Sequence, residues 1–308
     1  MERNFLSIEN NRLKLIINLR GGGISQFFEK SPEKKHLIYG YDTTEKQDGC
    51  MGDILFPWTG RVENRQYTFH KKKYKLVDED NKNPYALHGL VKNQNFTLLK
   101  RTKNSVKLEL KLKASKFKAK GYPFGAVISV VYTLLNNGFS VYTAVTNNGE
   151  ETLPFGLGFH PYFCLDVDKI DDLYLEIPAK SLIEFDSNLK PTGKIINIEK
   201  SDFDYSKLKL IGNQQIDNCF TGLNYKNNEA ITTLKNLKTN HQIRIIQDKN
   251  MPYIQVYSSD TIKKENYRKG IAIEPQTCCG YALNIPELGL RELGPKKQFI
   301  CQWRVEVK

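Results

Sequence analysis

Short runs of alternating apolar and polar residues, each ending at turn-forming residues, restrict the fold of this sequence more than any other feature. Residues 106–112 read Val-Lys-Leu-Glu-Leu-Lys-Leu, the two-residue period of a strand with one buried face. Residues 127–135 and 140–146 are also rich in strand-forming residues, and the Asn-Asn-Gly turn at 136–138 between them predicts a hairpin. No long run has the 3.6-residue period and capping residues of a helix.

The same strand pattern recurs along the rest of the chain, so the sequence predicts an all-β protein. Further strand-like runs occur at 13–19, 173–177, 243–246 and 253–257. Many strands separated by closely spaced turns are typical of a sandwich of antiparallel sheets rather than of alternating βαβ units. The 308 residues contain no linker rich in Pro, Gly or Ser and no internal repeat, so we expect one domain over residues 1–308.

The charge of the chain suggests a nucleic-acid partner, but its distribution argues against one. The net charge is +12, and phosphate neutralisation by Lys and Arg drives non-specific nucleic-acid binding. The lysines are spread over the whole chain together with many asparagines, which indicates a compositional bias, so we predict no nucleic-acid partner. The sequence contains no run of about 18 apolar residues, so it predicts no membrane-spanning helix. The N-terminal residues lack the apolar stretch of a signal peptide, which favours a cytoplasmic location.

The cysteines do not form a metal-binding pattern. There are six, and they include neither a Cys-x-x-Cys pair nor a nearby pair of histidines: Cys50, Cys164, Cys219, Cys278, Cys279 and Cys301. We therefore predict reduced thiols and no metal site. The triple glycine at 21–23 is not followed by the Gly-Lys-Ser/Thr of a phosphate-binding loop and is predicted to form a turn.

A histidine in an apolar and aromatic setting is the first candidate for chemistry. His160 lies in the segment 154–163, which reads Pro-Phe-Gly-Leu-Gly-Phe-His-Pro-Tyr-Phe. Glycines in such a strand pattern let a ligand or another backbone approach closely, and the proline after the histidine argues against a helix. The segment fits a strand end that opens onto a pocket. It also fits a core histidine whose nitrogens bind backbone groups.

Three other polar side chains stand out against apolar surroundings. Arg61 follows an apolar segment, and its planar donors suit paired sugar hydroxyls, although a surface salt bridge explains it equally well. His88 precedes Gly89 and follows a turn-forming stretch. Glu274 follows Ile-Ala-Ile, so its carboxylate must be paired or at a pocket rim unless it faces solvent at the strand end.

The order of these motifs resembles that of the aldose 1-epimerases, also called galactose mutarotases, over nearly the whole chain. The resemblance rests on Gly-Arg-Val at 60–62 with Gln-Tyr-Thr-Phe at 66–69, Leu-His-Gly at 87–89, Phe-His-Pro-Tyr-Phe at 159–163, Ile-Asp-Asn-Cys-Phe at 216–220, Gln-Val-Tyr at 255–257, and Glu-Pro-Gln at 274–276 with Ala-Leu-Asn at 282–284. Each motif alone is weak, and their shared order carries the resemblance.

This resemblance implies a fold, an activity and a set of site residues. The fold would be a β-supersandwich, in which large twisted antiparallel sheets form a groove for a monosaccharide such as an aldohexose. The protein would be an isomerase that needs neither a metal nor an organic cofactor. Glu274 would be the catalytic base and His160 the catalytic acid. Four further residues fall at positions that hold sugar hydroxyls: Arg61, His88, Asp217 and Gln276.

The chemistry of anomer interconversion explains why such a pair is needed. One group removes the proton of the anomeric hydroxyl while another protonates the ring oxygen, and a carboxylate and an imidazolium suit these tasks. Because histidine ordinarily titrates near ~6.5, we expect a neighbour such as Asp217 to keep His160 charged. On chemical grounds alone, three aromatic residues are candidates for packing against the apolar face of the sugar ring: Phe56, Trp58 and Tyr162.

Departures from the family pattern leave the substrate open. Gly60 stands where asparagine is usual, residues 89–92 lack a second glycine, and residues 277–280 are unusual. A mutarotase for free aldoses, a 1-epimerase for hexose 6-phosphates and a carbohydrate-binding protein without turnover all remain possible. A phosphate would need a cluster of cations, for which the sequence offers Arg61, Arg65 and Lys92. The sequence predicts neither the preferred sugar nor the oligomeric state.

Overall fold

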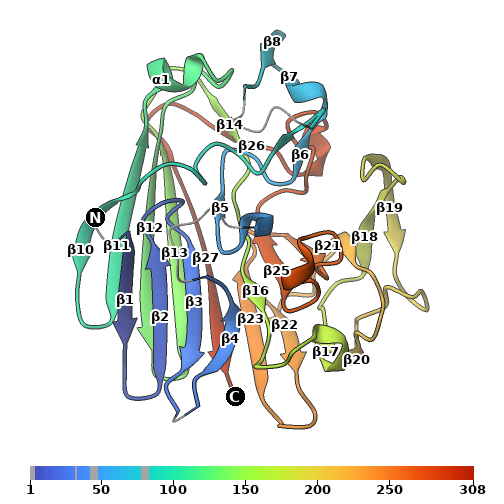
Figure 1. The fold of residues 1–308 in the computed structure, drawn as a ribbon. Coiled ribbons are helices and arrows are strands. Elements are labelled where there is room, and N and C mark those ends of the chain that lie inside the picture. The colour runs from blue at the N-terminus through green and yellow to red at the C-terminus, as the bar shows by residue number, and fades with distance from the viewer. Residues whose placement is uncertain (1–3, 32, 42–47, 78–82) are drawn as a thin grey trace.

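The computed structural model describes residues 4–31, 33–41, 48–77 and 83–308, and its main elements are two large antiparallel sheets (Figure 1). The larger sheet has twelve strands. Its main path runs in the order β1 (Phe5–Glu9), β2 (Leu13–Asn18), β3 (Ile24–Glu29), β4 (Lys35–Tyr39), β16 (Tyr162–Phe163), β25 (Ile271–Gln276), β24 (Tyr253–Tyr257), β21 (Asp217–Thr221), β18 (Ser181–Phe185) and β19 (Pro191–Asn197). Beside this path, β15 (Gly158–Phe159) pairs with both β25 and β5 (Ile54–Leu55).

The second sheet has nine strands and packs against the first. Its order is β10 (Thr97–Arg101), β11 (Ser105–Leu112), β12 (Ala126–Leu135), β13 (Gly138–Asn147), β27 (Gln298–Val307), β23 (Gln242–Asp248), β22 (Glu229–Lys235), β17 (Tyr174–Glu176) and β20 (Lys209–Leu210). Strand β10 forms one edge of this second sheet. Strands β1–β3 of the larger sheet lie over β11–β13 (Figure 1).

Smaller elements complete the described chain. Three two-stranded sheets pair β6 (Arg61–Val62) with β9 (Ala86–Leu87), β7 (Gln66–Phe69) with β8 (Lys72–Lys75), and β14 (Leu153–Phe155) with β26 (Arg291–Leu293). The helical segments are α1 (Ala114–Lys118) and the single turns η1 (Asp48–Cys50), η2 (Glu63–Arg65), η3 (Ile170–Asp172), η4 (Lys264–Asn266) and η5 (Pro286–Leu288). The prediction of an all-β protein is confirmed. No helix within the described ranges is long and apolar enough to cross a membrane.

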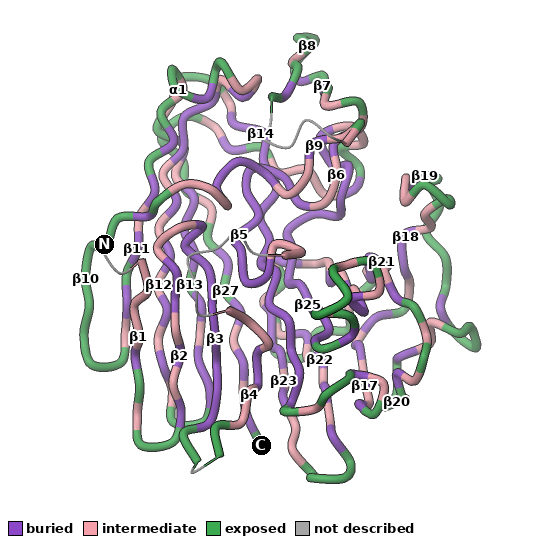
Figure 2. The backbone as a smooth tube through the Cα atoms, viewed as in Figure 1, coloured by how far each residue is buried: buried purple, intermediate pink, exposed green. Residues whose placement is uncertain are grey.

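Apolar side chains that recur at every second residue of the strands fill the space between the large sheets. Strand β12 buries every second side chain, and its partner β13 starts at Gly138, opposite Leu135, as the predicted hairpin requires. The inner faces meet at aromatic contacts such as that between the rings of Phe27 and Phe139, whose centroids are 4.9 Å apart. Figure 2 shows the buried strands in purple between exposed loops. Each large apolar side chain buried in this way contributes about 1.5–3 kcal/mol.

A buried arginine ties together the loops at one end of the larger sheet. Arg268, 2% exposed, donates from Nε to Asp171 Oδ1 at 2.6 Å and from Nη1 to Asp260 Oδ1 at 2.8 Å. The same guanidinium binds the backbone carbonyl oxygens of Gly212 and Gln214, at 2.5 and 3.2 Å. These two residues precede β21, so Arg268 fixes where that strand begins.

Replacing this arginine is expected to destabilise the fold strongly. In Arg268→Met, the buried carboxylate of Asp260 loses its cation, and removing one partner of a buried pair costs about 3–5 kcal/mol. Urea unfolding at neutral pH measures the loss. The control is Lys238→Met, because the Lys238–Asp172 pair is exposed and should contribute no more than about 1 kcal/mol. Equal losses in the two variants would contradict the role given to Arg268.

Candidate functional site

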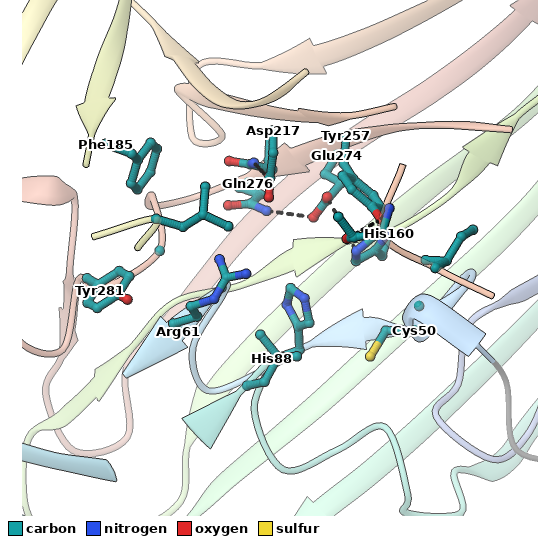
Figure 3. A pocket seen from close by; sticks show the side chains of 18 of the residues that line it. Cys50, Arg61, His88, His160, Phe185, Asp217, Tyr257, Glu274, Gln276 and Tyr281 are labelled. Atoms are coloured by element: carbon teal, nitrogen blue, oxygen red, sulfur yellow. Dashed lines mark hydrogen bonds and ion pairs between the residues drawn. The ribbon is translucent and has the colours of Figure 1, made fainter. Parts of the chain in front are cut away.

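A cavity of about 190 Å³ lies against the larger sheet (Figure 3). It is lined by residues of β21, β24 and β25, by residues of β6 and β9, and by the segment between β15 and β16. All six site residues expected from the sequence line it: Arg61, His88, His160, Asp217, Glu274 and Gln276. Side chains that are up to 215 positions apart in the sequence, from 61 to 276, therefore surround one small volume.

The alternation of β25 explains how an apolar strand presents polar groups. Ile271 and Ile273 point into the hydrophobic core, whereas Glu274 and Gln276 face the cavity. Successive side chains of a strand point to opposite faces, but both faces are covered here, so all six residues of β25 are buried. The neighbouring strand places Gln255 directly opposite Glu274.

His160 reaches the same cavity from the other side of β25. Gly158 pairs with Gln276 and Tyr162 with Ala272, which brings the residue midway between them level with Glu274. A side chain at residue 158 would crowd this arrangement, because a Cβ atom there would lie 2.9 Å from the Cγ2 of Thr59 and 3.0 Å from the Cγ of Gln276. The backbone of His160 is held as well, since its N–H donates to the carbonyl oxygen of Asp53 at 3.1 Å.

His160 and Glu274 form a buried pair. Nε2 of His160 lies 3.4 Å from Oε1 of Glu274, and their side chains are only 5% and 2% exposed. The other carboxyl oxygen, Oε2, accepts a hydrogen bond from Nε2 of Gln276 at 2.8 Å. Two rings fix the imidazole: Tyr162 stacks on it with centroids 5.0 Å apart, and His88 meets it edge-on at 5.1 Å. One acid-base pair is thus held in a defined geometry inside a cavity.

Burial favours the uncharged form of both members of this pair. It raises the pKa of Glu274 well above its ordinary value, and the nearby carboxylate of Asp217 raises it further. It lowers the pKa of His160 to about 3, and the ammonium group of Lys92 also lowers it. The expectation that a neighbour such as Asp217 keeps His160 charged is therefore not supported, because burial is the largest influence on the pKa of His160.

Asp217 is engaged by other partners. Its Oδ1 accepts a hydrogen bond from Nε2 of Gln255 at 2.7 Å, and burial raises its pKa while the guanidinium of Arg61 partly opposes that rise. Burial, the largest cause, lowers the pKa of His88 well below its ordinary value, and the nearby His160, Lys92 and Arg61 lower it further. The cavity therefore combines one arginine with polar side chains whose charged forms burial disfavours.

Two of the three aromatic candidates do not reach the cavity. Phe56 and Trp58 belong to the hydrophobic core, with exposures of 0% and 2%, and the ring of Phe56 packs 5.8 Å from that of Phe155. Both side chains fill space in the hydrophobic core. An apolar sequence segment does not show whether its aromatic residues pack in the core or face a ligand. Tyr162 does line the cavity, but one face of its ring is covered by His160.

The sequence reasoning missed several residues that line the cavity. Gln255 and Tyr257 had a usable signal, because alternation along β24 puts them on one face beside Glu274. Phe185, Leu189 and Tyr281 had none, since each comes from a loop or strand end with no motif of its own.

Of the three cations suggested for a phosphate, Arg61 alone lines the cavity. Arg65 and Lys92 do not line it; they donate to the backbone carbonyl oxygens of Asn83 and Leu87, at 2.6 and 3.2 Å. Among the lining residues that the structure describes, Arg61 carries the one arginine or lysine side chain, and its guanidinium lies 5.1 Å from the ring centroid of Tyr85.

Gly60 and residues 277–280, which depart from the family pattern, meet in space. Gly60 and Gly280 both line the cavity, and a Cβ atom on Gly60 would lie 2.7 Å from the Cα of Gly280. The backbone of one segment therefore occupies the place of a side chain on the other. Within the described chain, no group of three or more His, Cys, Asp or Glu side chains is arranged to hold a metal, and no disulfide joins the six cysteines.

Comparison with known proteins gives a consistent result. Residues 4–299 match the family model described as Aldose 1-epimerase. The uncharacterised protein YihR of Escherichia coli is 28% identical over 250 residues, which cover 81% of this chain and 77% of that protein. An aldose 1-epimerase of Streptococcus thermophilus is 25% identical over 88% of this chain and 85% of its own. The structure of a GalM/aldose epimerase homologue from C. elegans superimposes with a TM-score of 0.86 at 21% identity, over 99% and 98% of the two chains, which shows the shared galactose mutarotase-like fold.

Replacing the buried carboxyl is expected to stabilise the protein at neutral pH. The pKa of Glu274 is raised in the folded state, so the wild-type protein loses stability as the pH rises from the unfolded value, near ~4.3, through the raised folded value. In Glu274→Gln no proton is released, so its advantage in unfolding free energy should be present at pH 7 and vanish near pH ~4.

Urea unfolding at several pH values measures this difference. Glu287→Gln is a suitable control, because Glu287 is exposed and its replacement should show no such pH dependence. A glutamine at position 274 that destabilises the protein at pH 7 would contradict the expectation.

Proposed function

The chain belongs to the aldose 1-epimerase family, and from this premise we propose that it interconverts the α and β anomers of a free aldohexose by acid-base opening of the ring. The observation that carries the proposal is the buried contact of 3.4 Å between His160 and Glu274 inside a small polar cavity. The volume of about 190 Å³ is below the roughly 300–1,000 Å³ of sites for drug-sized ligands, which suits a single sugar.

The proposed reaction divides two proton transfers between the pair. Glu274 removes the proton of the anomeric hydroxyl while His160 protonates the ring oxygen, so the C1–O5 bond breaks and an open-chain aldehyde forms. Rotation about the C1–C2 bond turns the other face of the carbonyl towards the attacking hydroxyl. Ring closure with the two residues in exchanged roles gives the opposite anomer. Such general acid-base catalysis typically contributes about 10²- to 10⁴-fold.

The uncharged pair that burial favours already holds the proton that this reaction needs. A protonated Glu274 beside a neutral His160 has the same total charge as a carboxylate beside an imidazolium. Transfer of one proton from Glu274 to His160 therefore gives the carboxylate and the imidazolium that the reaction needs, without uptake of a proton from solvent. This transfer becomes favourable once a bound sugar supplies hydrogen-bond partners to the two charges. The distance of 3.4 Å is long for a hydrogen bond, and catalytic contacts often tighten only when substrate binds.

The remaining polar residues suit the hydroxyl groups of the ring. Arg61, His88 and Gln276 offer donors, and Asp217 offers an acceptor whose position is fixed by Gln255. The single arginine among the described lining residues favours a free sugar over a hexose 6-phosphate, since phosphate recognition draws on several charged donors. Retention of both members of the acid-base pair favours turnover over binding alone.

Polarimetry on freshly dissolved α-anomers tests the activity. The protein should accelerate the approach of an α-aldohexose to its anomeric equilibrium, and Glu274→Gln should remove nearly all of that acceleration because the base is lost. Circular dichroism checks that the variant is folded, and Glu287→Gln should behave as wild type because residue 287 is exposed and away from the cavity. A Glu274→Gln variant as fast as wild type would refute the assigned base.

The pH dependence of kcat/KM gives a separate test of the proton arrangement. Burial lowers the pKa of His160 to about 3, so a second proton should not enter the pair of the free enzyme between pH ~7 and ~5, and kcat/KM should not fall as the pH drops through this range. As the pH rises through the raised pKa of Glu274, the shared proton leaves and the rate should fall. A loss of activity as the pH falls, with a midpoint near ~6.5, the ordinary histidine value, would contradict this arrangement.

A further inference from the structure

One end of the cavity is apolar and is built by a projecting hairpin. Phe185 and Leu189, from the end of β18 and the turn before β19, line the cavity together with Tyr281. Figure 3 shows Phe185 and Tyr281 at the opposite end of the cavity from Cys50, with the polar side chains between. We call Phe185, Leu189 and Tyr281 the end wall.

The turn of the hairpin has a fixed shape. The N–H of Asp186 donates to the carbonyl oxygen of Lys190 at 2.8 Å, and the N–H of Leu189 donates to that of Asp186 at 2.9 Å. The side chain of Asp186 accepts two more backbone hydrogen bonds, from Asn188 at 2.8 Å and Lys190 at 3.0 Å. These four bonds hold Leu189 where it meets the cavity.

The hairpin is also attached to the opposite side of the cavity. Nζ of Lys190 lies 2.6 Å from Oε1 of Glu63, which directly follows β6, the strand of Arg61. The N–H of Glu63 in turn donates to Oδ1 of Asn284 at 2.8 Å, in the segment that carries Tyr281. Phe185 packs against the apolar cluster that contains Tyr281. The Lys190–Glu63 pair is partly exposed and contributes little to stability, so packing and turn geometry hold the wall.

The proposed reaction sets the direction of the sugar relative to this wall. C1 and the ring oxygen must lie at His160 and Glu274. In Figure 3, Gln276, Asp217 and Arg61 lie between this pair and the end wall, so the ring hydroxyls extend in that direction. C4 is opposite C1 across a six-membered ring, and it therefore points at the wall.

We propose that the end wall restricts the enzyme to single sugar units and excludes reducing sugars that carry a second sugar on O4. This inference rests on the proposed mutarotase function and extends it to the class of substrate. A glycosyl group at O4 would have to occupy the space of Phe185 and Leu189. It would also place hydroxyls against an apolar surface, where lost hydrogen bonds with water are not replaced.

Mutarotation of glucose, maltose and cellobiose by the same protein tests the proposal, because both disaccharides are glucose units substituted at O4. For wild type, kcat/KM should be at least about 100-fold lower for the disaccharides than for glucose, near the upper range for steric discrimination in a pocket. In the double variant Phe185→Ala, Leu189→Ala the disaccharide rate should rise about tenfold or more, while glucose loses less than about tenfold from lost packing.

Ile195→Ala is the matched control. Ile195 lies on the same hairpin but is 65% exposed and does not line the cavity, so its replacement should leave both rates as in wild type. If the double variant fails to fold, Leu189→Ala alone decides the question, because its side chain is half-buried and lies outside the core clusters.

The results separate this proposal from the function on which it rests. Wild-type protein that converts maltose as fast as glucose would overturn the end wall and leave the mutarotase proposal intact. A folded variant that still turns over glucose but gains nothing on either disaccharide would also overturn it. Wild-type protein that accelerates no anomer would instead refute the mutarotase proposal itself.

Discussion

The pairing of β25 with its neighbours is the constraint on which the cavity depends. The register opposite β15, β16 and β24 decides which residues share a level with Glu274, and it selects His160 on one side and Gln255 on the other. A slip of one residue would turn Glu274 towards the core and Ile273 towards the cavity. The isoleucines of β25 oppose such a slip, since they are fully buried in the space between the sheets. Core packing therefore sets the geometry of the acid-base pair.

The cavity contains two ionisable side chains whose charged forms are disfavoured by burial. Glu274 and His160 are almost completely buried, and an unpaired buried charge would be costly. The amide of Gln276 and the stacked ring of Tyr162 hold the two side chains in place without adding charge. Burial thus favours the uncharged forms of the pair, and under the proposed reaction charge separates only when a sugar binds. A buried carboxyl whose pKa is raised lowers the stability of the fold at neutral pH.

The sequence predicted the secondary structure well, but it predicted only some of the residues that line the cavity. Alternation is a local property, so the all-β class and the hairpin at 136–138 could be predicted and are confirmed, whereas the single domain over residues 1–308 stays a prediction. The ordered motifs predicted six residues that the structure places around one cavity, and their roles remain proposals. Phe56 and Trp58 were placed wrongly because core and ligand-facing aromatics look alike in a sequence. The charge of His160 depends on burial, and the end wall depends on contacts between distant segments, so neither has a local signature.

The contact between Gly60 and Gly280 couples two segments that are distant in the sequence. Because a Cβ at position 60 would fall 2.7 Å from the Cα of Gly280, an asparagine there is incompatible with the present path of the other segment. A side chain at residue 60 therefore requires the backbone around Gly280 to shift as well. Redesign of this part of the cavity lining accordingly calls for simultaneous substitutions in both segments.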